Sequence, residues 1–324
     1  AIESTQGQTQ DLFRVGTSSN ATLPTTTDAS YFSVSAYGNT TITGKVLNPT
    51  LAGSYATSTY GIAVRGDYAY VVKRDGGATN VHFVIFDVSD PANPVVVSTA
   101  VNQGTAYSDL RSGIAVEGNF AYVGNFGSGF ISVYDISKPK SPQWVAELSN
   151  GNLARIMDMK IRGKYLYAST YDGDGIAIVD ISNPYLPVFV TEFEPGGQRI
   201  INMFDISGNY LYAPDALLDS LLIIDITNPA SPVLLDEFQP GGLNGNLNGV
   251  TSVAVQGKLA YILGNNLLSV VDVSDPYNPV LVKQTGSGIL NTSLDIKLSG
   301  RYAYIGNLSA SAAHGLTIFD LASS

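Results

Sequence analysis

The chain has 324 residues, 14% of them charged, and carries a formal net charge of −10 with a pI near 4.5. This balance argues against binding to nucleic acid or insertion at an anionic membrane, because both partners favour a basic face. Apolar runs fall short of the roughly 18 residues of a membrane span, and the absence of cysteine excludes disulfides, thiolate metal sites and cysteine nucleophiles.

The first 30 residues are polar, rich in Thr and Ser, and match no later part of the chain. A segment of this composition buries too little apolar surface to fold alone. We therefore expect an arm over residues 1–30 that docks on its own domain or on a neighbouring subunit, and a single domain over residues 31–324. The chain begins with Ala1 rather than Met, which predicts an exported protein, extracellular or at the cell surface, whose signal segment has been removed.

A repeated unit follows, and its first half is an apolar strand, a turn glycine and a strand carrying a tyrosine, as in "GIAVRGDYAYVV". This pattern predicts a β-hairpin in which glycine supplies the positive φ of the turn. The turn glycines of the six copies are Gly66, Gly118, Gly163, Gly208, Gly257 and Gly300.

The second half is an apolar run ending in aspartate, a turn with two prolines, and a further strand, as in "IAIVDISNPYLPVFV". An aspartate at this point can accept hydrogen bonds from backbone N–H groups two or three residues later. Six equivalent sites, one in each copy of the repeat, cannot share one substrate, so we interpret these aspartates as structural. They are Asp87, Asp135, Asp180, Asp225, Asp272 and Asp320.

Four short strands in about 47 residues match one blade of a β-propeller. The sequence therefore predicts an all-β fold, a six-bladed β-propeller with four-stranded blades. The sixth copy stops after its third strand, at "GLTIFDLASS", while "TTITGKV" at 40–46 has the character of the missing strand. We expect residues 40–46 to complete the last blade and close the ring, which would remove the free sheet edges.

The runs "IAIVDIS", "LLIIDIT" and "LSVVDVS", each followed by a P-x-x-P turn, resemble the LVIVD-repeat family of cell-surface β-propeller proteins. The resemblance covers about residues 40 to 321. It implies the propeller fold and an exported location. It carries no shared catalytic residues to transfer to this chain.

Candidate metal ligands are few, and each has a plain structural alternative. Asp172 and Asp174 in "YDGDG" could hold Ca²⁺, although such sites need six to eight oxygens and a polar turn explains the same pattern. His82 and His314 are the two histidines, at similar positions in the first and last copies, which ring closure would make neighbours. Apart from a possible Ca²⁺, no cofactor is expected.

Three arginines, Arg111, Arg155 and Arg199, precede the innermost strands of consecutive copies. They could form a cationic patch on the loop face that binds a carboxylate or a sulfated sugar, or they could anchor loops through salt bridges.

The innermost strands carry a few charged residues. Lys160 and Asp205 occupy equivalent positions in adjacent copies, which predicts an ion pair between blades. Asp158 and Asp295 are the acids best placed for pore chemistry. They belong to the third and sixth copies, so we expect them on opposite sides of the ring.

These features favour a non-enzymatic extracellular scaffold, a self-assembling cell-surface or filament subunit whose arm contacts other copies. The expected partners are copies of the chain itself, and a glycan or surface protein. An alternative is a glycan- or peptide-binding adhesion module that uses the variable loop face. A pore-centred enzyme of the lyase or lactonase type ranks last, because the loops hold few convergent charged groups.

Overall fold

The computed structural model describes residues 59–74, 81–101, 113–124, 129–153, 155–171, 175–241, 247–264, 266–287, 289–290, 293–307 and 316–321, together with short strands at 13–16, 31–34 and 40–43. The chain divides into two compact units, Ala1–Ser54 and Tyr55–Ser324. This division falls later in the sequence than residue 30. The docking predicted for the arm at residues 1–30 lies outside the described residues.

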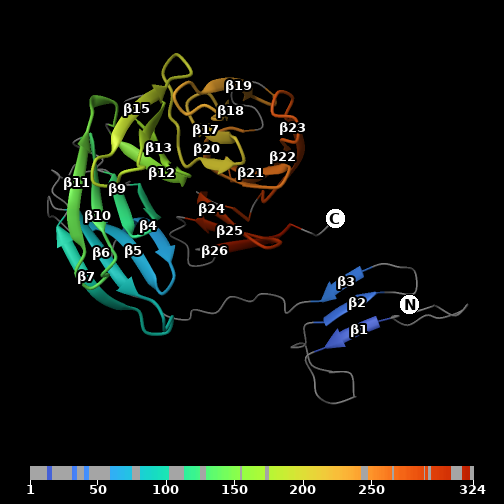
Figure 1. Cartoon of the computed structure of the whole chain (residues 1–324). Helices are drawn as coiled ribbons and strands as arrows, with labels where there is room; N and C mark the ends of the chain where they lie inside the picture. The colour runs from blue at the N-terminus through green and yellow to red at the C-terminus, as the bar shows by residue number, and fades with distance from the viewer. Residues whose placement is uncertain are drawn as a thin grey trace, which may run out of the picture. The chain divides into compact units, whose positions relative to one another are not determined.

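The larger unit is a six-bladed β-propeller whose blades are antiparallel sheets arranged around a centre (Figure 1). Blades one to three contain β4 (Thr59–Arg65), β5 (Tyr68–Arg74), β6 (Val81–Asp87), β7 (Val95–Val101); β8 (Ile114–Glu117), β9 (Phe120–Gly124), β10 (Phe130–Asp135), β11 (Gln143–Ser149); β12 (Ile156–Arg162), β13 (Tyr165–Thr170), β14 (Ile176–Asp180) and β15 (Val188–Phe193). Blades four to six contain β16 (Asp205–Ser207), β17 (Tyr210–Asp215), β18 (Ser220–Asp225), β19 (Val233–Phe238); β20 (Val250–Gln256), β21 (Leu259–Gly264), β22 (Leu267–Asp272), β23 (Val280–Thr285); β24 (Ser293–Ser299), β25 (Tyr302–Asn307) and β26 (Leu316–Asp320). The fold class predicted from the repeat is confirmed.

The turn between the first two strands of each blade needs a residue in the left-handed backbone conformation, and that residue is glycine in all six blades. The six turn glycines have φ between 54° and 62°. A side chain at this backbone angle would be strained. The G-x-aromatic pattern in the sequence is therefore a backbone requirement repeated six times.

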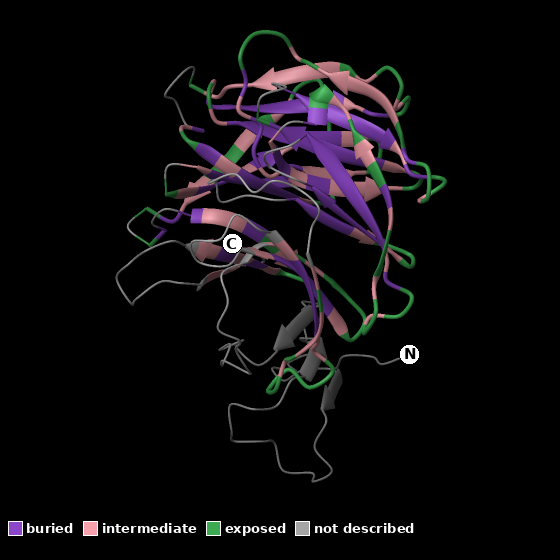
Figure 2. Ribbon diagram, turned by 90° about the vertical axis from the view of Figure 1, so that its left-hand side faces the viewer, coloured by how far each residue is buried: buried purple, intermediate pink, exposed green. Residues whose placement is uncertain are grey.

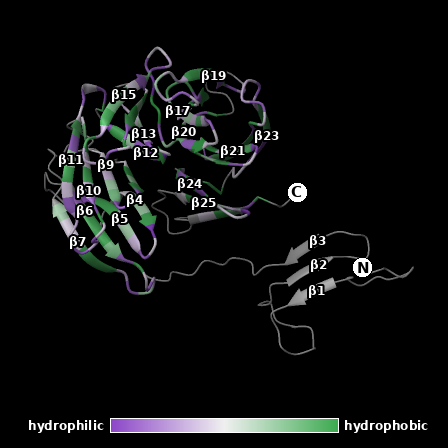
Figure 3. Cartoon of the chain, in the orientation of Figure 1, coloured by the Kyte–Doolittle hydropathy of each residue, from purple (hydrophilic) through white to green (hydrophobic). Residues whose placement is uncertain are grey.

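The third strand of each of the first five blades is largely buried, and β14 shows that both of its faces are covered. Ile178 packs with residues of blade four, while Val179 packs with residues of blade two. Alternate side chains point to opposite faces of a sheet, so a strand between two blades must be apolar throughout. Figure 2 shows the resulting buried strands and exposed loops, and Figure 3 shows the matching apolar strands.

The predicted ring closure by residues 40–46 is not what the structure shows. Strand β3 (Thr40–Thr43) pairs with β2 (Tyr31–Val34), which pairs with β1 (Phe13–Gly16) in a separate three-stranded sheet. Among the described residues, the last blade has three strands and β26 pairs with β25 alone. Pairing of β3 with its neighbour in sequence closes a short loop, which costs less chain entropy than joining distant segments.

Buried apolar clusters join each consecutive pair of blades from one to six. Within the described part of the chain, no such cluster joins blade six with blade one. Ile62 on β4 is accordingly 64% exposed, whereas Ile114, its equivalent on β8, is 7% exposed. Among the described residues, no helix has the length and apolar character of a membrane span.

Candidate functional site

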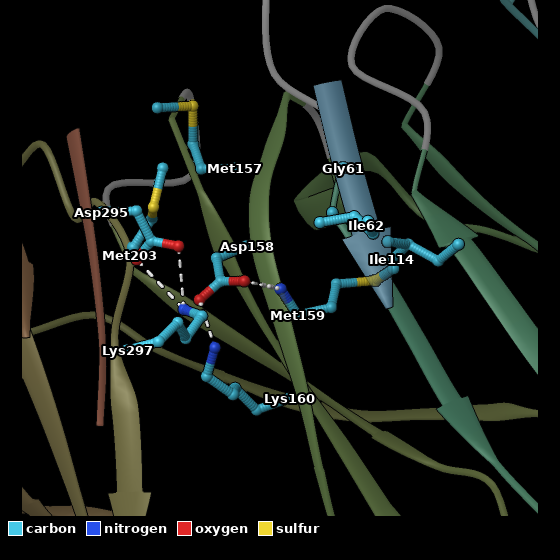
Figure 4. A pocket seen from close by; sticks show the side chains of 11 residues that line it. Gly61, Ile62, Ile114, Met157, Asp158, Met159, Lys160, Met203, Asp295 and Lys297 are labelled. Carbon is cyan, nitrogen blue, oxygen red and sulfur yellow. Dashed lines mark hydrogen bonds and ion pairs between the residues drawn. The ribbon is translucent and has the colours of Figure 1, made fainter. Parts of the chain in front are cut away.

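A pocket of about 220 Å³ lies where the innermost strands converge (Figure 4). Five blades contribute to it, and its described lining combines small, apolar and charged side chains. The lining residues are Gly61, Ile62, Gly113, Ile114, Met157, Asp158, Met159, Lys160, Met203, Asp295 and Lys297.

One strand position supplies a pocket residue from nearly every blade. It is the residue five before the turn glycine, and from blade one to blade six it is Gly61, Gly113, Asp158, Met203, Ser252 and Asp295. In blades one, three, five and six the strand register shifts just before this residue. Such a β-bulge redirects a side chain, and bulges are common beside active sites. The bulges therefore belong to the construction of the pocket.

Two of these residues are aspartates, and each is paired with a lysine two positions later. Asp158 Oδ2 lies 3.0 Å from Lys160 Nζ on β12, and Asp295 Oδ2 lies 2.9 Å from Lys297 Nζ on β24. In both aspartates Oδ1 also accepts the backbone N–H of the following residue, at 2.9 Å and 2.8 Å. Figure 4 shows both pairs beside the same space, with Ile62 and Ile114 on the other wall. The two acids come from opposite blades, and the structure brings them to one pocket.

The predicted ion pair between Lys160 and Asp205 is wrong. Lys160 pairs with Asp158 on its own strand, while Asp205 Oδ2 accepts the backbone N–H of Val255 at 2.8 Å. Residues two apart on a strand share a face, so the D-x-K spacing favoured the partner that sequence analysis overlooked. The same signal, present in blades three and six, would have indicated Lys297 as a pocket residue.

Lys160 is a cation held by several carboxylates. Its burial would lower the pKa of the ammonium, but Asp158, Asp205 and Asp295 together raise that pKa above its ordinary value. Asp295 of blade six thus acts electrostatically on Lys160 of blade three. Ser252 Oγ donates a hydrogen bond to Asp295 Oδ1 at 2.9 Å and so ties the fifth blade to the same group.

Blades one and two carry glycine where the other blades carry aspartate, methionine or serine, and at Gly113 the missing side chain lets the third blade approach closely. A Cβ on Gly113 would lie 2.8 Å from Met159 Cγ and 3.0 Å from the Asp158 carbonyl carbon. The three methionines of the chain, Met157, Met159 and Met203, all line the pocket. Sequence analysis did not single them out, although their restriction to two neighbouring copies was a visible signal.

The repeated aspartates lie at the turns after the third strands. Five of the six accept a hydrogen bond from the backbone N–H two residues later, at 2.7–3.0 Å. In the sixth, Asp320 Oδ2 lies 2.6 Å from Arg301 Nη2. These contacts are local to each blade, and none of the six aspartates lines the pocket.

Two of the three arginines predicted for a ligand-binding face, Arg155 and Arg199, do not line the pocket. Arg199 is 7% exposed, and its Nη1 lies 3.0 Å from Asp215 Oδ2 and 2.7 Å from Glu237 Oε1. The Arg155 guanidinium lies over the Tyr171 ring, 4.8 Å from its centroid. Arg111 lies outside the described residues. Arg199 therefore anchors a loop, and a cationic face formed by the three arginines stays a prediction.

Three of the four candidate metal ligands, Asp172, Asp174 and His314, lie outside the described residues, and His82 lies on β6 away from the pocket. Within the described part of the chain, no group of three or more His, Asp or Glu side chains is arranged to hold a metal ion. Calcium binding stays a prediction.

Solved structures with low sequence identity share the fold. A Lactobacillus plantarum protein is 15% identical with a TM-score of 0.68, covering 95% of this chain and 91% of its own. A putative 6-phosphogluconolactonase from Bacteroides uniformis is 13% identical with a TM-score of 0.62, covering 95% and 96%. The periplasmic gluconolactonase of Pseudomonas aeruginosa is 16% identical with a TM-score of 0.63, covering 90% and 87%. No curated protein is a significant match.

These neighbours correct the functional prediction. The chain was expected to be a non-enzymatic, self-assembling scaffold, with a lactonase-type enzyme ranked last. Propellers named as lactonases share its fold over most of its length, so the fold gives no ground for setting an enzyme aside. The ranking rested on the loops, whereas the charged groups converge on the inner strands, where two D-x-K segments meet at one pocket.

The family is shown by the sequence itself. The model of the LVIVD repeat matches six segments, residues 58–101, 111–148, 155–194, 204–239, 249–285 and 292–323. Each segment corresponds to one blade, and together they span well over half of the chain. The chain therefore belongs to the LVIVD-repeat family.

Proposed function

We propose that this propeller is a hydrolase that opens the ester ring of a sugar lactone in its central pocket. The observation that carries the proposal is the pair of aspartate–lysine units facing one pocket, Asp158 with Lys160 and Asp295 with Lys297. Ester hydrolysis needs a base to activate water and a positive group to stabilise the developing oxyanion. Carboxylate and ammonium groups at one pocket supply both.

The two units differ in access, which gives them different roles. The Asp295 side chain is 36% exposed and that of Asp158 is 18% exposed. Asp295 is therefore the better base for a water molecule that enters with the substrate. Lys160, kept charged by the surrounding carboxylates, is the better group to stabilise negative charge on the lactone carbonyl oxygen.

The reaction then proceeds as follows. Asp295 takes a proton from water while the water oxygen forms a bond to the carbonyl carbon, and negative charge develops beside Lys160. The bond between that carbon and the ring oxygen breaks, and the proton on Asp295 passes to the leaving oxygen. The product is the open-chain hydroxy acid, so one water molecule is consumed for each lactone.

The pocket also fits a small polar substrate. A volume of 220 Å³ is the space of about seven water molecules at about 30 Å³ each. This is small for a drug-sized ligand and suits a single sugar ring. The names of the lactonase propellers with the same fold support the choice of lactone among esters.

The test measures the hydrolysis of D-glucono-δ-lactone and related aldonolactones by the purified chain. Acid release above the spontaneous rate is the readout. Asp295→Asn should lower kcat by about 10²–10⁴-fold, the usual contribution of a general base. Asp225→Asn, the same change at a repeated turn, is the matched control and should leave the rate unchanged. Absence of any catalysed rate, or full activity in Asp295→Asn, would refute the proposal.

Export from the cytoplasm stays a prediction, supported by the periplasmic location named for the Pseudomonas aeruginosa propeller. Fractionation of the source cells would test it, and recovery in the cytoplasm alone would contradict it. A homo-oligomer and a glycan or surface-protein partner stay predictions too.

A further inference from the structure

The charges of the pocket limit the kind of substrate that it can accept. Two lysines, Lys160 and Lys297, line it, and the described lining contains no arginine or histidine. Each lysine is paired at 2.9–3.0 Å with the aspartate two residues before it. Neither ammonium is therefore left as an uncompensated cation.

A third carboxylate, Asp205, lies outside the described lining but raises the pKa of Lys160 together with Asp158 and Asp295. Asp205 occupies in blade four the position that Lys160 occupies in blade three. Both of its oxygens accept backbone N–H groups, from Ile206 at 2.9 Å and from Val255 at 2.8 Å. The described lining therefore balances two lysines with two aspartates, and Asp205 acts on Lys160 from beyond it, in a chain whose net charge is −10.

A phosphate monoester needs the opposite surroundings. It carries a charge between −1.5 and −2 at neutral pH, and proteins bind it with unpaired Arg or Lys groups or with clustered backbone N–H donors. The rest of the wall that the structure describes consists of glycine backbone and of isoleucine and methionine side chains, which offer no charge to balance it. A sugar ring without phosphate, by contrast, can donate its hydroxyl groups to the carboxylates.

We propose, on the basis of the lactonase function proposed above, that the substrate is an uncharged sugar lactone and that the pocket excludes the phosphorylated form. The two classes are represented among the lactonase propellers that share the fold, one named as a gluconolactonase and one as a putative 6-phosphogluconolactonase. The charge balance of this pocket assigns the chain to the uncharged class.

The first experiment compares kcat/KM for D-glucono-δ-lactone and 6-phospho-D-glucono-δ-lactone. We expect a preference of at least about tenfold for the uncharged lactone, because placing like charges together costs more than the 1.4 kcal/mol of a tenfold change. Equal or faster hydrolysis of the phosphorylated lactone would overturn the substrate class while leaving the lactonase function intact.

Binding separates the two proposals if neither lactone is hydrolysed. Calorimetry with the non-hydrolysable D-glucono-δ-lactam and with 6-phospho-D-gluconate needs no turnover. Binding of the lactam alone would support the uncharged class even after the lactonase function had failed. Binding of 6-phosphogluconate, or of neither compound, would overturn it.

A variant tests the cause of the exclusion. Asp158→Asn removes the carboxylate that is paired with Lys160, so affinity for 6-phosphogluconate should rise by about tenfold or more. Asp225→Asn, at an outer turn, should leave the affinity unchanged. An Asp158→Asn protein that folds normally and still rejects 6-phosphogluconate would contradict the charge argument.

Discussion

The propeller carries two sets of aspartates, one at the turns after the third strands and one on the innermost strands. The turn set recurs in all six blades, and five of its members make the same hydrogen bond to the N–H two residues later. The inner-strand set, Asp158, Asp205 and Asp295, occupies positions that hold other residues in the remaining blades, and two of its members, Asp158 and Asp295, line the pocket. One set shapes the same turn in blade after blade, and the other contributes to a single site.

The difference teaches where to look for chemistry in a repeat protein. A residue present in every repeat meets a requirement of the repeat itself, such as a turn or a packing face. A charged residue that departs from its equivalents is free of that requirement and can serve a site. The rule needs a second criterion, that the residue does not serve as a buried structural anchor, because Asp215 is also confined to one blade and yet is fully buried in an ion pair with Arg199.

Replacement of Arg199 by methionine would test that second criterion and should give the largest loss of stability. Asp215 is fully buried and would lose its ion pair with Arg199, and breaking a buried pair costs about 3–5 kcal/mol. The free energy of unfolding, measured with urea, should fall by that amount. Arg155→Met, which removes the stacking on Tyr171, should cost about 1 kcal/mol or less. Similar losses in both variants would show that the buried ion cluster is not an anchor.

Replacement of Gly113 by alanine would test how tightly the inner strands define the pocket. The added Cβ would meet Met159 Cγ at 2.8 Å, and overpacking of this kind costs about 1–3 kcal/mol. Because Met159 lines the pocket, lactone binding should weaken along with stability. Gly151→Ala, where a Cβ meets nothing within 4 Å, is the matched control for the unfolding measurement. Equal stability of the two variants would mean that β8 and β12 can separate at little cost.

The sequence predicted the fold well because each blade repeats the same physical requirements. A left-handed turn needs glycine, a strand buried on both faces needs apolar residues, and six copies made both patterns visible. The two acids of the pocket were also found from the sequence, as departures from the repeat at inner strands. The sequence did not show that these two acids line the same pocket, because residues of opposite blades come together only when the innermost strands surround a narrow centre.

Two predictions failed for reasons that are also physical. Lys160 was assigned to Asp205 across blades, although a residue two positions away on the same strand was nearer. Residues 40–46 were assigned to the last blade because that copy lacks its fourth strand and because TTITGKV has the character of one, but a short β-prone strand of this kind can pair with any free edge. Strand β3 pairs with its neighbour in sequence instead.

Replacement of Asp180, a member of the turn set, should give the smallest effect. Hydrogen bonds from Ser182, helped by Lys164 at 3.0 Å, lower the pKa of this carboxyl to about 2. Since the unfolded value is about 3.9, the charged form stabilises the fold above pH 4, and that contribution is lost as the pH falls from 4 to 2. Asp180→Asn keeps an oxygen for the turn but lacks the charge, so it should cost about 1 kcal/mol or less near neutral pH, as for other exposed pairs.

The measurement is urea unfolding of the wild type and Asp180→Asn at several pH values between 7 and 2. The difference in unfolding free energy should shrink below pH 4 and vanish near pH 2, while lactone hydrolysis at neutral pH stays unchanged. A constant difference would mean that the side chain acts through its shape rather than its charge. Lost hydrolysis would place a repeated aspartate in the chemistry and remove the distinction between the two sets.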